Sequence, residues 1–357
     1  MNRVLVERLD DSGASAAAWN AYVESHADST IYHLFAWRRI FERSFGYRSW
    51  LLVARDESNG TLCGGLPLYL VKSFFGRRLV SVPFRDRGGL LWNTSEAFQA
   101  LMAEARKVAL EANASSVTLK TITPYPQTLA ESALLQEHRH WIHSAVDLRG
   151  LTADILWQRI GDKNRNMVRQ AQRSGLTCAL LPREASSIRR WYELHVATQK
   201  RLGVPPFPLS YFTHLSAELE AHQMAIFGVS ADEKLVAATI LLLHGKTAIY
   251  GYSASGSGGQ QRRTNDLMLH TVMLWLIQRD YRCFDMGSDS PRQESLLFFK
   301  RKWLSAQRPI PYYYWGVSTP PTVDSSDHAY RLARALFSRL PTPVLKIVGS
   351  KITRFFG

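Results

Sequence analysis

Two residues, Asp285 and Lys300, have side chains suited to proton transfer and to charge stabilisation. Asp285 follows a short strand-like run, Cys283–Phe284, and precedes a glycine turn. A carboxylate at a strand end can accept the proton of an attacking amine, although an aspartate there equally caps the turn that follows. Lys300 stands among aromatic residues and can stabilise the oxyanion formed when an ester carbonyl is attacked. Binding of a polyanion by Lys300 and Lys302 is the alternative interpretation.

Two tyrosines lie on the predicted strand that precedes Asp285 in the order of predicted strands. Tyr250 and Tyr252 alternate along a predicted strand, so both are expected to point to one face of the sheet. There they can line a pocket, or they can simply pack in the core. This strand leads into a glycine-rich loop, 255–264, and a helix over 266–279. Free N–H groups and the helix dipole make such a helix start a site for phosphate, although a plain surface loop has the same composition.

A basic helix is predicted over 154–174, with an interruption at Gly161. Arg165, Arg169 and Arg173 are spaced four residues apart and therefore share one face of the helix. Guanidinium groups pair with phosphate oxygens, so this face is a candidate phosphate clamp. An ordinary solvated helix face is the other possibility.

The composition describes a globular, strongly basic protein. The chain has 357 residues, enough for about two domains, and 46% of them are hydrophobic. Its net charge of +14 favours anionic partners such as nucleic acid, phosphorylated carriers or an anionic membrane face, or serves only solubility.

Several classes of site and location are disfavoured by simple patterns. Cys63, Cys178 and Cys283 are far apart, which argues against a disulfide framework or a zinc site and favours a reducing compartment. No HExxH, GxSxG or GxxxxGK[ST] motif occurs. The chain starts without a signal-peptide pattern, and its apolar runs are too short to span a bilayer, so we expect a cytoplasmic protein without a metal.

The order of predicted elements gives the domain organisation. Helices, an antiparallel meander, a helix and a strand occur in each half, so the fold class is α+β with two similar domains. We expect boundaries at 1–135 and 136–320, followed by a basic amphipathic tail, 321–357. The tail is expected to be helical, broken at Pro341 and Pro343, and able to lie on an anionic membrane.

Motifs along nearly the whole chain together resemble the FemAB-like branch of the GNAT-type N-acyltransferases. The first half contributes Trp37, Gly64–Leu68 and Pro83–Gly89. The second half contributes KNRNMVRQA at 163–171, YGYSAS at 250–255, FDMG at 284–287, FKRKW at 299–303 and YYY at 312–314. The tail resembles that of a subgroup found beside exopolysaccharide and protein-sorting gene clusters.

The resemblance implies two tandem GNAT-like acyltransferase domains, each a mixed, mostly antiparallel sheet flanked by helices. It implies transfer of an acyl or aminoacyl group from acyl-CoA or aminoacyl-tRNA, with no tightly bound cofactor, to an amine of a peptidoglycan or exopolysaccharide precursor. Lys300 and Asp285 are the catalytic candidates. The candidates for substrate contacts are Lys163, Arg165, Arg169, Tyr250, Tyr252, Asn265, Phe299, Lys302, Trp37 and Asp86.

A second hypothesis is a non-catalytic protein that binds RNA or an anionic carrier on the same duplicated scaffold. The charge of +14 and the absence of glycines on the helix side of the loop, where acyl-CoA enzymes carry them, both favour this alternative.

Overall fold

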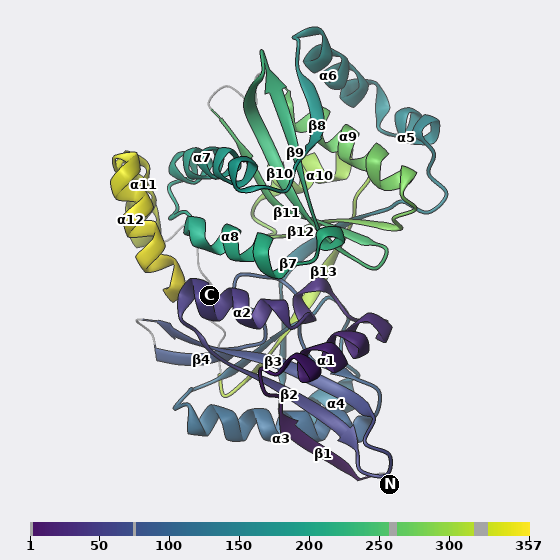
Figure 1. Ribbon diagram of the computed structural model, residues 1–357, viewed down its shortest axis with the longest axis vertical. Coiled ribbons are helices and arrows are strands. Elements are labelled where there is room, and N and C mark those ends of the chain that lie inside the picture. Colours follow the sequence, from purple (N-terminus) through teal and green to yellow (C-terminus); the bar gives the residue numbers. More distant parts are fainter. Residues whose placement is uncertain (1–2, 74–75, 257–262, 318–327) are drawn as a thin grey trace. The chain divides into compact units, whose positions relative to one another are not determined.

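The computed structural model describes residues 3–73, 76–256, 263–317 and 328–357. The chain divides into two compact units, labelled by element in Figure 1. Unit 1 comprises Met1–Trp141, Pro309–Thr322 and Ile352–Gly357, and unit 2 comprises Ile142–Arg308 and Val323–Lys351. The division therefore differs from the expected boundaries, because the aromatic strand near residue 312 and the last residues of the tail belong to unit 1.

Unit 1 is a mixed sheet with the strand order β1-β2-β3-β4-β6-β13. Its strands are β1 (Val4–Arg8), β2 (Arg48–Asp56), β3 (Leu62–Ser73), β4 (Gly76–Val80), β6 (Val117–Lys120) and β13 (Ala306–Trp315), with the short β5 (Leu91–Trp92) beside β3. The first four strands are antiparallel neighbours, and β6 then runs parallel to β4. The last strand, β13, pairs antiparallel with β6, opposing Tyr312 to Lys120.

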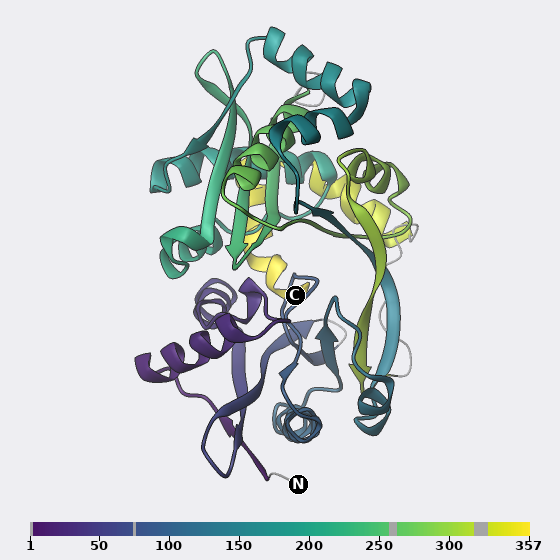
Figure 2. The same ribbon diagram turned by 90° about the vertical axis from the view of Figure 1, so that its right-hand side faces the viewer.

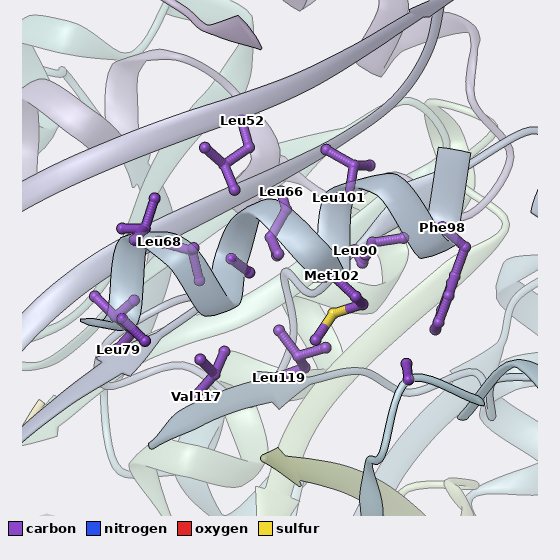
Figure 3. Close-up of a cluster of buried hydrophobic side chains, with 14 of the residues drawn as sticks. Leu52, Leu66, Leu68, Leu79, Leu90, Phe98, Leu101, Met102, Val117 and Leu119 are labelled. Atoms are coloured by element: carbon purple, nitrogen blue, oxygen red, sulfur yellow. The ribbon is translucent and has the colours of Figure 1, made fainter. Parts of the chain in front are cut away.

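The helix that connects the parallel strands builds the core of unit 1. Thr94 caps α3 (Ser95–Glu111), which buries a stripe that includes Phe98, Leu101 and Met102. Figure 3 shows these side chains beside strand residues such as Leu66, and Figure 2 views α3 nearly end-on against the sheet. The other helices are α1 (Gly13–Ser25), η1 (Ile31–His33), α2 (Ala36–Phe45) and α4 (Gln127–Ser132).

A pair of glycines on β3 lets two helices approach the sheet, α1 at Gly65 and α3 at Gly64. A Cβ atom added to Gly65 would lie 2.2 Å from the ring of Trp19, and one on Gly64 would lie 2.9 Å from Leu101. Trp19 is fully buried, and its indole N–H donates to the carbonyl of His33 at 2.6 Å. Glycine is therefore required at 65 because the bulky indole occupies the space that any side chain would need.

Unit 2 repeats this arrangement with the strand order β7-β12-β11-β10-β9-β8. Its strands are β7 (Gln136–Asp147, which begins in unit 1), β8 (Thr177–Leu181), β9 (Met224–Ala231), β10 (Lys234–His244), β11 (Thr247–Ser255) and β12 (Cys283–Asp289). Strands β8 to β11 are antiparallel neighbours, α9 (Thr264–Gln278) follows, and β12 runs parallel to β11. In both units, therefore, the last strand comes from a distant part of the chain, β13 in unit 1 and β7 in unit 2.

Helices pack on the sheet of unit 2 in two groups. Residues of α6 (Gly161–Arg173) and α9 share one core with strand residues such as Phe227, Leu241 and Ala248. The aromatic residues of α7 (Ala185–Leu202) and α8 (Leu209–Glu218) form a separate cluster around Tyr252. The remaining helices are α5 (Ala153–Arg159), η2 (Ala221–Gln223) and α10 (Glu294–Lys302). The predicted α+β class is confirmed.

The tail forms two helices and a final turn. Helix α11 (His328–Arg339) ends before Pro341, and α12 (Thr342–Ile352) contains Pro343 in its first turn. The predicted break at Pro341 is confirmed, but the one at Pro343 is wrong, because proline needs no N–H in a first helical turn. The turn η3 (Thr353–Phe355) follows. None of the described helices is long and apolar enough to cross a membrane.

Candidate functional site

Strands β11 and β12 of unit 2 diverge after three residue pairs. They run parallel and pair only over Thr247–Ile249 and Cys283–Asp285. Residues 250–255 of β11 and 286–289 of β12 then continue without pairing to each other, while β11 keeps β10 on its other side. The backbone edges that face each other there do not satisfy one another. An extended chain with amide groups can therefore pair with them.

Asp285 occupies the point where the two strands part. The residue is 1% exposed, and its Oδ2 accepts from Nε2 of His143 on β7 at 2.9 Å. Its Oδ1 accepts from the backbone N–H of Gly287 at 2.8 Å, and Gly287 has a φ of +77°. Asp285 thus caps the turn that follows it, and it also forms a buried pair with a histidine. Such a pair can hold or pass on a proton.

Lys300 belongs to α10, and its side chain reaches the last residues of β12. It is 7% exposed, and its Nζ donates to the carbonyl of Met286 and to Oδ2 of Asp289, both at 2.5 Å. A buried ammonium group is stable only with such partners, because burial removes its hydration. An ammonium group has three protons, and these two bonds employ two of them. The positive charge therefore stands beside the diverging strands.

The two candidate tyrosines point to opposite faces of the sheet. A β-bulge places Tyr250 opposite Leu241 and Tyr252 opposite Ile240, so Gly251 is the extra residue. Tyr250 packs edge-on against Phe284 in the core shared with α9, and burial raises its pKa to about 12. Tyr252 instead lies among the aromatic side chains of α7 and α8, and its hydroxyl bonds that of Tyr211. The prediction that both share a face is wrong, because the bulge reverses the alternation.

The start of α9 lies near the end of α10. Arg263, in the left-handed region, supplies no side-chain cap, and the Oδ1 of Asn265 is buried without a partner among the described residues. Asp266 is 7% exposed, and burial raises its pKa, while Arg263 and Lys302 act in the opposite direction. Of the predicted glycine-rich loop, residues 257–262 lie outside the described residues, and Gly256 is described.

This arrangement matches a known acyltransferase domain. Residues 162–294 match the acetyltransferase (GNAT) domain family, and this range covers β8 to β12 together with the parted strands. The matched range lies within unit 2, and the parted strands β11 and β12 with the residues around them are here called the GNAT site. No curated protein sequence matches the chain.

Solved structures extend the likeness over both units. The crystal structure of FemX is 15% identical, with a TM-score of 0.68, and the match covers 93% of this chain and 100% of FemX. The C-terminal domain of a putative lysylphosphatidylglycerol synthetase from Agrobacterium fabrum is 16% identical, covers 85% and 92%, and has a TM-score of 0.58. A tandem GNAT protein from the clavulanic acid biosynthesis pathway is 12% identical, covers 89% and 100%, and has a TM-score of 0.57. The predicted tandem GNAT fold is confirmed.

The basic helix α6 contacts α10 through Asn164, which is not one of the predicted site residues. The buried Asn164 donates to the backbone carbonyl of Lys302 at 2.6 Å, which ties α6 to α10. Arg165 donates to the carbonyls of Trp157 and Gln158 at 3.0 Å and pairs with Asp162, so it joins α5 to α6.

The remaining basic candidates on α6 are open to solvent. Arg169 lies over the ring of Trp157, 5.3 Å from its centroid, and is exposed, as is Lys163. The described contacts of α6 thus engage Arg165 within the unit and leave the other two side chains accessible to an anionic substrate.

Two further candidates, Trp37 and Asp86, lie in unit 1. Trp37 is fully buried in an aromatic cluster with Tyr32 and Phe41. Asp86 accepts two hydrogen bonds from the buried Arg87, at 2.9 and 2.7 Å.

The structure therefore gathers only part of the predicted set in unit 2. Its members are Tyr250 and Asp285 where β11 and β12 part, Phe299, Lys300 and Lys302 on α10, and Asn265 at the start of α9. Sequence reasoning missed His143 and Asp289, the partners of Asp285 and Lys300. Asp289 follows Asp285 by four residues in the same acidic stretch, which was a usable signal, whereas His143 is joined to it only by strand pairing.

Lys120 is the last residue of β6, the strand of unit 1 that corresponds to β12 of unit 2. Burial lowers its pKa to about 7, and nearby Arg78 adds to this effect. Its Nζ lies 5.9 Å from the centre of the Tyr312 ring. Unfolding restores an ordinary lysine pKa, so between about pH 7 and pH 10.5 the unfolded chain binds more protons than the folded chain, and stability rises with pH.

Lys120→Met is therefore expected to raise the melting temperature below pH 7, where the wild-type protein keeps a partly buried charge. The gain should shrink as the pH rises and become small above about pH 10.5, because the wild-type lysine is then mostly neutral in both the folded and the unfolded chain. Thermal melts of both proteins from pH 6 to pH 10.5 check this. Lys107→Met, on the exposed side of α3, is the control. A gain that stays constant with pH would count against the lowered pKa of Lys120.

Proposed function

We propose that this protein is an N-acyltransferase that transfers an acyl or aminoacyl group to an amine of a cell-envelope precursor. The GNAT domain over 162–294 supports the reaction class. The likeness to FemX and to the putative lysylphosphatidylglycerol synthetase domain supports aminoacyl transfer in the cell envelope as its setting, whether the acceptor belongs to peptidoglycan or to an exopolysaccharide.

The observation that carries this proposal is the parting of β11 and β12. Beyond Ile249 the two strands do not pair with each other, and an extended, amide-bearing segment of a donor or acceptor can bind beside β11 there as an additional strand. Such pairing holds the reacting carbonyl in a fixed position and orientation, which lowers the entropic cost of the reaction.

The proposed reaction needs a proton acceptor and stabilisation of negative charge. The amine nitrogen of the acceptor attacks the carbonyl carbon of the donor, an N–C bond forms, and the ester C–O or thioester C–S bond breaks. Lys300 stabilises the negative oxygen through its charge. The Asp285–His143 pair takes the proton lost by the amine, and the leaving oxygen or sulfur finally receives a proton.

The donor is an acyl-CoA or an aminoacyl-tRNA. Acyl-CoA is the co-substrate of the GNAT fold, whereas the charge of +14 favours a polyanion such as tRNA. The exposed Lys163 and Arg169, with Lys302, are the side chains of unit 2 that we assign to donor or acceptor phosphates. No group of three or more metal-binding side chains occurs in the described part of the chain.

The second candidate function is binding of RNA or an anionic carrier without catalysis. The same basic charge favours it, and it would make binding steeply dependent on salt concentration. A cytoplasmic protein that touches the anionic inner face of the membrane is compatible with either function. Leu332 and Leu336 of α11 are 64% and 61% exposed and supply an apolar face for such contact.

Isothermal titration calorimetry with acetyl-CoA, and then with a charged and an uncharged tRNA, tests the proposed function. We expect one donor to bind, and we expect the charged tRNA to bind more tightly than the uncharged one if the aminoacyl group enters the parted strands. Equal binding of both tRNAs with a steep salt dependence, and no binding of acetyl-CoA, would favour the non-catalytic alternative.

A further inference from the structure

Unit 1 contains an open pocket away from the ends of its parallel strands. The pocket has a volume of about 500 Å³, and all of its lining residues belong to unit 1. It lies where α2 and α3 end, where β2 and β4 begin, and where β3 ends. The parallel strands β4 and β6 finish at Val80 and Lys120, at the other end of the sheet, so this pocket is separate from the place in unit 1 that corresponds to the GNAT site.

Four cations surround this pocket. They are Arg48, Lys72, Arg77 and Arg354. All four side chains are exposed, and within the described residues none of them forms an ion pair with a carboxylate. Positive groups that converge on a concave surface without counter-charges raise the local concentration of anions.

The single acidic side chain of the pocket is already neutralised. Glu111 accepts two hydrogen bonds from Arg8, both at 2.7 Å, in a side-by-side arrangement. Arg8 and neighbouring Arg48 both lower the pKa of Glu111, Arg8 more strongly. Glu111 therefore stays ionised and paired, and it leaves the net positive charge of the pocket largely intact.

The walls between the cations are apolar and aromatic. They include Phe45, Tyr47 and Leu70, and Phe355 from the final turn of the chain. Tyr47 donates to the carbonyl of Arg354 at 2.6 Å, and Arg78 donates to the carbonyl of Gly357 at 2.5 Å. These two bonds hold the end of the chain against unit 1, so the last residues complete the pocket.

We propose that this pocket binds a small phosphate ester with an apolar or aromatic organic part. Guanidinium and ammonium groups bind phosphate oxygens through charge-assisted hydrogen bonds, and the rings accommodate the organic part. The volume lies within the range of sites for small molecules. A nucleoside diphosphate and a phospholipid headgroup share this chemistry. The inference concerns unit 1 alone and stands whether or not unit 2 transfers acyl groups.

Calorimetric titration of the full chain with three probes tests the proposal. The probes are inorganic pyrophosphate, ADP and dihexanoylphosphatidylglycerol below its micellar concentration. Arg77→Glu and Lys72→Glu are each expected to weaken binding at least tenfold, because each removes a charge-assisted bond and adds a repulsive charge. Both side chains are exposed, so thermal melts should show that the variants fold normally.

Arg3→Glu is the matched control, since it makes the same change of charge on an exposed residue next to β1, which pairs with the opposite end of β2. Its affinity should stay within about twofold of the wild-type protein. Binding of ADP alone, or of the lipid alone, supports the proposal and identifies the source of the phosphate. Binding of none of the probes, or an equal loss in Arg3→Glu and Arg77→Glu, would overturn it.

Discussion

Lys300→Met is expected to lower the free energy of unfolding by about 3 kcal/mol, because it leaves the buried carboxylate of Asp289 without its counter-charge. The two side chains are only 8% and 10% exposed, and Nζ lies 2.5 Å from Oδ2. Chemical denaturation of the purified variant measures this loss. A loss under 1 kcal/mol would show that Asp289 finds another partner, or that the pair is hydrated in solution.

The double variant Lys300→Met with Asp289→Asn separates stability from chemistry. It removes both charges, so most of the lost stability should return, because no unpaired charge remains buried. If Lys300 stabilises the oxyanion, turnover should stay at least about 100-fold below that of the wild-type protein in both variants. Recovery of turnover together with stability would show that Lys300 only holds α10 against β12.

Asp285→Asn is expected to lower kcat by about 100-fold or more, with little change in KM, because it removes the charge that holds His143 as a proton acceptor. The amide has the shape of the carboxylate and can still accept from Gly287, so the turn should survive. Steady-state kinetics with the donor identified by calorimetry measures the effect.

The control for Asp285→Asn is Asp280→Asn, which removes an exposed carboxylate that pairs with Lys246 at the other end of α9. Its kcat should equal that of the wild-type protein. If Asp285→Asn also keeps its kcat, the carboxylate serves only as a cap for the turn, and the proton acceptor must be another group.

Local patterns in the sequence were sufficient for the elements that carry the site. The predicted strand at 248–253, the helix over 266–279 and the strand at Cys283 correspond to β11, α9 and β12, while most of the predicted glycine-rich loop lies outside the described residues. The interruption of the basic helix at Gly161 also occurs, since α5 ends at Arg159 and Gly161 has a φ of +74°. Each of these features depends on residues close together in the chain, so periodicity and glycine positions reveal them.

Features that depend on pairing between separate segments of the chain could not be predicted from the sequence. His143 meets Asp285 only because β7 pairs with β12, and nothing in the local sequence specifies that pairing. The bulge at Gly251 exists because of the register between β10 and β11, so strict alternation put Tyr252 on the wrong face. Arg165 has the same type and spacing as a phosphate-binding residue, yet carbonyls at the end of α5 engage it.

The last strand in the sheet of unit 1, β13, comes from a late part of the sequence, and this has a consequence for biosynthesis. While the ribosome is still making residues up to about 315, β6 has β4 on one side and nothing of β13 on the other. The nascent first half therefore presents an open strand edge next to the apolar surface that Tyr313 later covers. Chains that terminate early should be unusually prone to aggregate. We expect chaperones that shield strand edges to associate with this protein until β13 has been translated.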